Sequence, residues 1–121
     1  MTVLHEGPVK ATRKRHVCES CNQAIPIGRA ATKWVGITDG QFYACYFHPE
    51  CRVAEVAWNR MMRLGWDEWC NLANDLEIDD WPWLLEEYPV VALRLGLSRV
   101  KYDEAMQERE RCRAAFASFY R

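Results

Sequence analysis

The sequence predicts an α+β protein, in which a small β-hairpin-plus-helix finger precedes a mostly helical C-terminal part. The hairpin is indicated by two apolar, aromatic-containing runs, residues 30–35 and 41–47, on either side of the turn dipeptide Asp39-Gly40. Helical spacing of apolar residues begins directly after the second run. Two close pairs of cysteine and histidine bracket the hairpin, so the finger and its helix are expected to form one unit.

The N-terminal part is expected to hold an arm and the finger. Residues 1–12 lack apolar periodicity, so we expect a loose arm there. The finger should span residues 13–64, with a turn at 22–28, which contains a proline and a glycine. Its helix is expected to open at Pro49, because proline is tolerated in the first helical turn, and to end at a Gly65 cap.

Residues 65–121 are expected to form an acidic, tryptophan-rich series of helices. Apolar residues over 66–76 keep a three-to-four spacing, and a short helix is expected at 81–85. The last helix should start from a Ser98 cap and run to about Tyr120. We expect its apolar stripe to be buried within the protomer. The stripe consists of Tyr102, Met106, Cys112, Phe116 and Phe119.

The strongest motif is a pair of ligand pairs. Cys18 and Cys21 form C-x2-C, and His48 and Cys51 form H-x2-C after an interval of 26 residues. Zn²⁺ prefers a closed tetrahedron of thiolates and imidazole, and Cys3His is one of its usual ligand sets. Four ligands leave no open position for catalysis, so we predict one structural zinc ion. The sequence shows no export signal, and this favours metal over disulfides for the paired cysteines.

Other cysteines and histidines near the motif leave alternatives open. Cys45 lies three positions before His48 and could replace it as the fourth ligand. His16 could pack beside the site and hydrogen-bond a ligand sulfur, or be an ordinary surface histidine. Cys70 and Cys112 fall in apolar helical patterns, and we expect both to be small buried hydrophobic residues.

Three strings within residues 13–60 carry a resemblance: C-E-S-C-N-Q-A-I-P-I-G, D-G-Q-F-Y and F-H-P-E-C. They resemble zinc fingers of the poly(ADP-ribose) polymerase type, and LIM-type halves share part of the pattern. They are also similar to small uncharacterised zinc proteins of phages and prophages, in which an H-P-x-C helix precedes Trp-rich acidic helices. The resemblance implies a treble-clef fold over residues 13–64. Treble clefs serve DNA, RNA and protein binding and nuclease scaffolds, so other residues must decide the function.

The net charge of −1 hides an asymmetry between the two halves. Residues 1–60 hold eight Lys/Arg and five Asp/Glu, a balance of +3, whereas residues 61–121 hold eight and twelve, a balance of −4. The basic half could contact nucleic-acid phosphates while its aromatic residues stack on bases. The alternative is a solvated arm around a thiolate-rich site. The candidate contact residues are Arg13, Lys14, Arg15 and Lys33.

The acidic, tryptophan-rich segment admits three interpretations. It could form amphipathic helices with tryptophan inside, or a protein-binding face with aromatic anchors and an acidic rim. Such a face would prefer a basic partner, for example a nucleic-acid-binding protein. Catalytic carboxylates at Asp79 and Asp80 would be the third, but no nucleophile motif accompanies them. The candidate face consists of Trp66, Trp69, Asp79, Asp80, Trp81 and Trp83.

From these observations we expect a non-enzymatic, zinc-stabilised protein-binding module, such as a phage-type regulator or inhibitor of a host nucleic-acid-handling machine. The alternative is a nucleic-acid-binding zinc-finger protein that uses the basic N-terminal half. No catalytic motif supports a third class, a metal-dependent enzyme. No apolar run approaches the ~20 residues that span a bilayer, so we expect a cytoplasmic protein without a membrane partner. The sequence does not indicate an oligomeric state.

Overall fold

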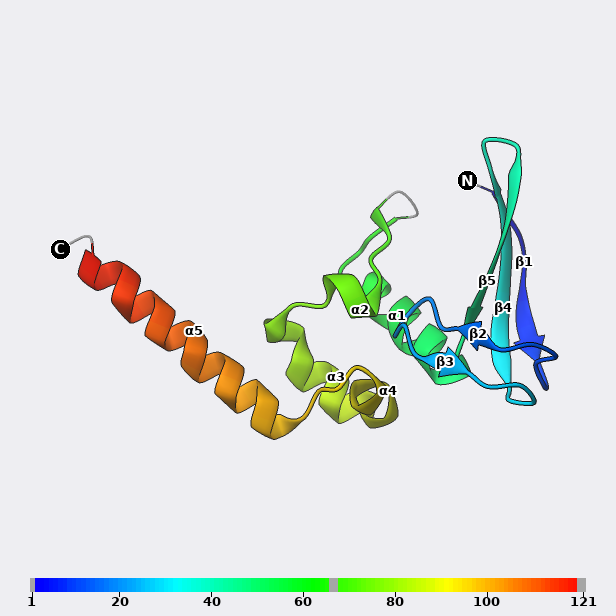
Figure 1. Cartoon of the computed structure of the whole chain (residues 1–121). Coiled ribbons are helices and arrows are strands. Elements are labelled where there is room, and N and C mark those ends of the chain that lie inside the picture. The colour runs from blue at the N-terminus through cyan, green and yellow to red at the C-terminus, as the bar shows by residue number, and fades with distance from the viewer. Residues whose placement is uncertain (1, 66–67, 120–121) are drawn as a thin grey trace. The chain divides into compact units, whose positions relative to one another are not determined.

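The computed structural model describes residues 2–65 and 68–119, which form an α+β fold divided into two units, Met1–Leu76 and Glu77–Arg121 (Figure 1). The first unit contains, in chain order, β1 (Thr2–Val9), β2 (His16–Val17), β3 (Ala24–Ile25), β4 (Ala31–Thr38), β5 (Gln41–Phe47), α1 (Pro49–Met61) and α2 (Leu72–Asp75). The second unit contains η2 (Ile78–Asp80), α3 (Trp81–Glu87), α4 (Pro89–Arg94) and α5 (Arg99–Phe119).

The predicted hairpin is present as β4 and β5, which pair antiparallel along their whole length. Asp39 and Gly40 form the two-residue turn with positive φ angles of 51° and 77°. Positive φ at both central residues is the type I′ geometry, whose twist matches that of the flanking strands. The strand expected at residues 30–35 starts one residue later and extends to Thr38, and β5 has its predicted bounds.

The loose arm expected at residues 1–12 is wrong, because Thr2–Val9 forms a third strand. It pairs antiparallel with β4 and gives the sheet order β1-β4-β5, as Figure 1 shows. An edge strand draws its stability from backbone hydrogen bonds on one side and needs few apolar side chains. The sequence of β1 therefore shows no clear alternation of apolar and polar residues, and Gly7 and Pro8 interrupt it further.

Helix α1 starts at Pro49 as predicted. It ends at Met61, with Met62 as its C-cap residue, and a Schellman motif closes it. The Arg63 N–H donates to the Arg60 carbonyl at 3.0 Å, and the Leu64 N–H donates to the Asn59 carbonyl at 3.0 Å. Arg63 adopts the left-handed conformation that this motif requires, with a φ of 58°. The predicted Gly65 cap is wrong because an arginine occupies the left-handed position.

The α-helix expected over residues 66–76 is also wrong, since only Leu72–Asp75 is α-helical in the described part of that segment. The buried Asn59 side chain pairs with the backbone of Cys70 through two hydrogen bonds of 2.9 Å, one donated by its Nδ2 and one accepted by its Oδ1. A side chain of α1 thus satisfies backbone groups that a helix would otherwise pair. The segment belongs to the first unit, which ends at Leu76 rather than at the expected residue 64.

The second unit has a small core of Leu84, Val91 and Ala92. The predicted short helix is α3, and the Ser98 Oγ accepts a hydrogen bond from the Lys101 N–H at 3.1 Å, which confirms the predicted cap of α5. The expectation of a buried α5 stripe is wrong, since α5 contains no buried residue among those that the structure describes. Helices α3 and α4 are too short to cover 21 residues of α5.

Neither of the two cysteines that were expected to be buried is fully buried. Cys112 is exposed, which contradicts the expectation of a buried thiol, and Cys70 is only partly buried. In the part of the chain that the structure describes, no helix combines the length and the apolar composition needed to cross a bilayer. α5 is the longest helix, and charged residues interrupt it throughout.

Candidate metal centre

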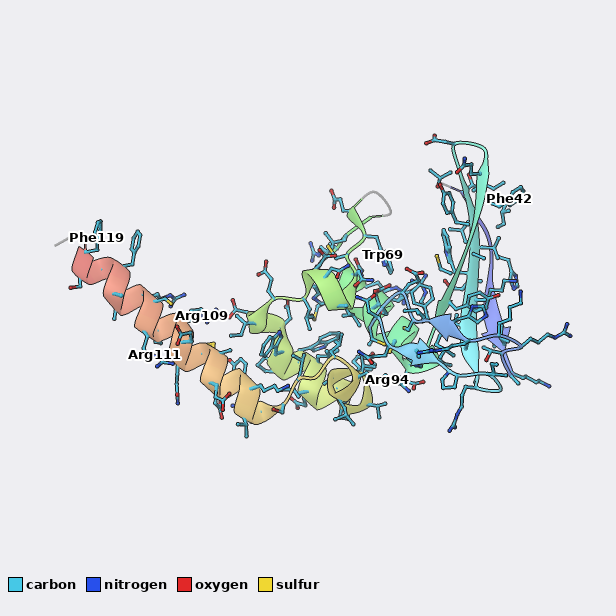
Figure 2. All side chains as sticks on the ribbon, viewed as in Figure 1. Phe42, Trp69, Arg94, Arg109, Arg111 and Phe119 are labelled. Carbon is cyan, nitrogen blue, oxygen red and sulfur yellow. The ribbon has the colours of Figure 1, made fainter. Side chains whose placement is uncertain are left out.

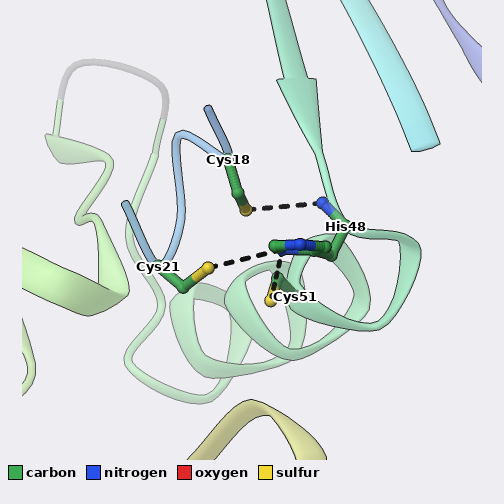
Figure 3. A group of neighbouring side chains, drawn as sticks. All are labelled: Cys18, Cys21, His48 and Cys51. Atoms are coloured by element: carbon green, nitrogen blue, oxygen red, sulfur yellow. Dashed lines mark hydrogen bonds between the residues drawn. The ribbon is translucent and has the colours of Figure 1, made fainter. Parts of the chain in front are cut away.

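The four predicted ligands meet in one buried cluster, as Figure 3 shows. Cys18 follows β2 and Cys21 lies in the turn before β3, while His48 is the N-cap residue of α1 and Cys51 lies in its first turn. Their ligand atoms all lie within 4.8 Å of one another. A β-turn and a helix start, separated by the hairpin, therefore converge on one point.

The distances match a tetrahedral zinc site. Cys21 Sγ lies 3.4 Å from His48 Nδ1, and Cys51 Sγ lies 3.7 Å from the same nitrogen. Usual Zn–S and Zn–N bond lengths place the sulfur and nitrogen corners of a zinc tetrahedron about 3.6 Å apart. The donor set and its spacing therefore fit Zn²⁺, with all four positions taken by protein ligands.

Neighbouring backbone groups orient the ligands. His48 Nε2 lies 3.1 Å from the Ala24 carbonyl oxygen, to which its N–H donates. That hydrogen bond leaves the Nδ1 lone pair directed at the cysteine sulfurs, as in most histidine–metal sites. The backbone N–H of His48 donates to Cys18 Sγ at 3.4 Å, and this contact stabilises a thiolate.

The thiols compete with one another for protons. Side-chain hydrogen bonds from Cys21 and Cys51 lower the pKa of Cys18 well below its ordinary value. Hydrogen bonding to Cys18 in turn raises the pKa of Cys21 and of Cys51. Three adjacent thiolates cannot coexist without a cation between them, because each disfavours ionisation of the next. A divalent metal ion removes this conflict and allows all three sulfurs to ionise.

The alternative residues do not join the cluster. Cys45 lies outside the group of ligand atoms and instead lines a separate cavity of about 200 Å³ together with Trp34, Phe47 and Trp69. Burial raises the pKa of the Cys45 thiol. The His16 ring stacks on Tyr46, with centroids 3.6 Å apart and planes 13° from parallel. His16 thus packs against the strand that leads to the centre.

Glu55 of α1 is a buried carboxylate close to the metal centre, and the sequence alone predicted no role for it. Glu55 Oε1 accepts hydrogen bonds from Ser20 Oγ at 2.8 Å and from the Leu72 N–H at 3.2 Å. Its Oε2 accepts one from Trp69 Nε1 at 3.1 Å and lies 3.6 Å from the Arg52 guanidinium. Glu55 thereby joins the cysteine turn, α1 and the segment before α2.

A sequence signal for this network exists. Glu55 follows Cys51 by four residues, so both lie on the same face of α1 and must face the cysteine turn. Arg52 completes the arrangement: its Nη2 pairs with Glu6 Oε1 at 2.5 Å, and its guanidinium lies 4.9 Å from the Phe47 ring and 5.2 Å from the Trp69 ring. β1, β5 and the segment before α2 therefore all contact one arginine of α1.

The predicted nucleic-acid contacts lie on the first unit. Arg13, Lys14 and Arg15 are exposed in the segment between β1 and β2. Lys33 is half-buried on β4, and its ammonium group lies 5.7 Å from the centroid of the Tyr46 ring. The structure thus places all four residues within the metal-bearing unit.

The residues of the predicted protein-binding face are divided between the two units. Trp69 belongs to the first unit, where its Nε1 bonds Glu55. Asp79 belongs to the second unit and accepts a hydrogen bond from Arg109 Nη1 at 2.9 Å. Asp80, Trp81 and Trp83 lie in the same unit and are half-buried, and Trp66 lies outside the described residues.

The arrangement can hold a metal ion, and its closed donor set suits a structural role. The chemistry of the cluster depends on four side chains and on the backbone contacts that hold them in place. No protein-family model, no curated protein and no solved structure matches this chain.

Proposed function

We propose that the first unit is a zinc-stabilised nucleic-acid-binding module of the treble-clef kind, in which the zinc ion is structural and a basic surface of the same unit binds phosphates. One observation carries the proposal: exposed cations are held on two ordered loops of the same unit as the metal centre. We call residues 10–15 and 26–29 the basic loop pair. They precede β2 and follow β3, so they meet at the end of the β2–β3 ribbon that is opposite the cysteine turn.

Thr12 joins the two loops. Its N–H donates to the Arg29 carbonyl at 2.9 Å, and its carbonyl accepts from the Gly28 N–H at 2.8 Å. Its hydroxyl donates to the Pro26 carbonyl at 2.8 Å, and the residue is only 4% exposed. The cations on these loops are therefore displayed from a fixed backbone, and little backbone entropy would be lost on binding.

The charge of the basic loop pair is uncompensated. All of its cationic side chains are exposed, and within residues 2–65 and 68–119 no carboxylate forms an ion pair with them. Cations without protein partners are free to neutralise phosphates and release counterions, which drives sequence-independent binding of nucleic acids. The cations are Lys10, Arg13, Lys14, Arg15 and Arg29.

One face of the sheet in the same unit offers rings for stacking. Alternation along β5 places Phe42 and Tyr46 on one face, opposite that of Cys45. Lys33 is the cross-strand partner of Tyr46, and His16 stacks on the Tyr46 ring. Phe42 is 72% exposed near the hairpin turn, where Figure 2 labels it. Proteins that bind unpaired bases combine such rings with cations that follow the backbone, so we propose single-stranded nucleic acid as the ligand.

The test is a triple variant, Arg13→Ala/Lys14→Ala/Arg15→Ala. Fluorescence anisotropy with a labelled single-stranded oligonucleotide should show at least about tenfold weaker binding, and the slope of log affinity against log salt should become shallower by about 2. The matched control is Arg99→Ala/Arg111→Ala/Arg113→Ala, which removes the same charge from exposed positions of α5 and should bind as the wild type does. Equal weakening in both triples, or no salt-dependent binding by the wild-type protein, would refute the proposal.

A second candidate function, protein binding, is favoured by the surface of the second unit. Val90 and Leu93 of α4 are 52% and 76% exposed, and Val100 at the start of α5 is 65% exposed. The neighbouring Glu86 and Glu87 of α3 are exposed too, so apolar side chains stand beside an acidic border. Such a surface fits a partner that has apolar residues inside a basic rim. A phage-type regulator of a nucleic-acid-handling machine would need a surface of this kind to bind its target.

For this candidate we expect Leu93→Asp to remove a partner that the wild-type chain retains in a pull-down from host extract. An aspartate at Leu93, the most exposed of these three apolar positions, would have to lose its hydration when the partner binds. Ser118→Asp adds the same charge at an exposed position of α5 and should leave retention unchanged. Quantitative mass spectrometry of the retained proteins compares the three chains. Identical profiles for Leu93→Asp and the wild type would exclude the patch.

A further inference from the structure

The two edges of the three-stranded sheet differ in their protection. Edge strands expose unpaired backbone groups, and proteins usually block them with proline, charge or a bulge. β1 carries Glu6 and Pro8, and its register with β4 shifts between Val3 and His5. β5 (Gln41–Phe47) contains no charged residue and no proline, and its pairing with β4 runs without a shift.

The backbone groups that β5 leaves open can be assigned from its turn. In a two-residue hairpin the flanking residues, Thr38 and Gln41, form a hydrogen-bonded pair, and bonding then alternates along the strand. Phe42, Ala44 and Tyr46 therefore direct their backbone groups away from β4. The Glu19 N–H donates to the Tyr46 carbonyl at 3.0 Å, which agrees with this assignment.

The cysteine turn thus closes the edge of β5 at Tyr46 and leaves a short open stretch beyond it. Within the described part of the chain, no backbone hydrogen bond reaches the outward groups of Phe42 and Ala44. The side chains there are apolar and exposed: Phe42 by 72% and Tyr43 by 46%. An uncharged aromatic edge of this kind is a template for strand addition.

We propose that this edge pairs with β5 of a second copy of the chain, antiparallel and centred on Tyr43. The pattern is self-complementary: Phe42 of one copy faces Ala44 of the other, and the reverse, so that two donors and two acceptors from each strand are all paired. The two Tyr43 side chains lie opposite each other at the two-fold axis in a non-hydrogen-bonded pair, where side chains are closest. An isologous contact of this kind closes on itself as a dimer.

The length of the open stretch favours β5 itself as the occupant. An incoming strand that continued past Tyr46 would meet the Glu19 backbone, which already occupies that position. In the centred register, Gln41 of the second copy lies opposite Cys45, and the next residues are the Asp39-Gly40 turn, at which that chain leaves the edge. β5 also carries no charge, so its pairing with itself places no like charges together.

The first test is the oligomeric state of the zinc-loaded full chain by sedimentation velocity across a concentration series. We expect a concentration-dependent dimer for the wild type. Ala44→Pro removes one outward N–H and leaves the β4–β5 ladder intact, and Phe42→Lys adds a charge at the edge. Both variants should sediment as monomers with unchanged zinc content and circular dichroism. The matched control, Leu4→Lys, alters a residue of β1 that is 50% exposed and should remain dimeric.

The second test fixes the register. In Tyr43→Cys the two new thiols would face each other across the axis at a Cα separation of about 4.5 Å, within disulfide range. After mild oxidation, peptide mapping should find a disulfide that joins the introduced thiols of the two copies. Gln41→Cys, whose partner in this register is Cys45, should give no disulfide between its two introduced thiols. A wild-type chain that stays monomeric at all concentrations, a dimer that survives both edge variants, or a Tyr43→Cys dimer without that disulfide would overturn the proposal.

Discussion

Replacing Cys21 by alanine is expected to remove zinc and unfold the first unit. Cys21 supplies one of three thiolates in a closed four-ligand site, and its sulfur lies 3.4 Å from His48 Nδ1. Structural zinc sites contribute about 10–16 kcal/mol of binding free energy, as much as or more than the ~5–15 kcal/mol that stabilises a typical domain. Native mass spectrometry should show no bound zinc, and the far-UV signal of the β-sheet should be lost.

Two other cysteines provide the controls. Cys112→Ala alters an exposed thiol on α5, and Cys45→Ala alters the residue that could have replaced His48 in the sequence-based alternative. Both should retain one zinc ion per chain and melt near the wild-type temperature. Full zinc content with an unchanged melting curve in Cys21→Ala would disprove the site. Loss of zinc in Cys45→Ala would restore the alternative ligand set.

The metal centre and its hairpin could be predicted because their determinants are local in sequence. Asp39-Gly40 specifies a type I′ turn by its own backbone preferences, and Pro49 marks the first turn of α1. Cys18 and Cys21 are close enough to share one ion wherever the chain turns between them. The hairpin then returns β5 to the cysteine turn, and this brings His48 to the same cluster of ligand atoms.

The first strand could not be predicted, because β1 depends on a partner remote in sequence. Thr2–Val9 is extended since β4 offers it a row of hydrogen-bonding groups, and its own side chains carry no clear period. Glu6 gives a further reason, since it looks like a solvent-exposed carboxylate and yet pairs with the buried Arg52 of α1. Non-local ion pairs of this kind leave no trace in local spacing.

The segment before α2 shows how a correct period can mislead. Trp69 and Leu72 are spaced as on one helix, yet α2 begins only at Leu72, and both residues donate a hydrogen bond to one carboxylate of α1, Glu55. Asn59 of the same helix fixes Cys70 through two hydrogen bonds. Apolar spacing reports which residues avoid water, and here the buried polar side chains of a neighbouring helix decide the backbone conformation.

The second large effect is expected at Glu55, which is 2% exposed and accepts hydrogen bonds from three protein groups. Glu55→Ala should lower the free energy of unfolding by about 3–5 kcal/mol, because it leaves buried donors unpaired and removes one carboxylate from the buried Arg52. Glu55→Gln retains an acceptor oxygen and should cost clearly less. Guanidinium denaturation followed by circular dichroism measures both, and Glu86→Ala, an exposed carboxylate of α3, should change stability by less than about 0.5 kcal/mol.

The pH dependence of stability separates the effect of the Glu55 charge from the effect of its hydrogen-bonding and packing, which Glu55→Gln largely keeps. Burial raises its pKa above the ordinary value of 4.5, so the folded protein binds the proton more tightly than the unfolded chain does. The stability that the neutral Glu55 carboxyl contributes is fully present at pH values below its ordinary pKa. It is lost as the pH rises through the raised pKa of the folded protein. The wild-type chain should therefore gain stability relative to Glu55→Gln as pH falls through this window. Protonation of the zinc ligands affects both chains equally and therefore cancels in the difference between their free energies of unfolding. If that difference does not change with pH, Glu55 does not change its protonation on folding.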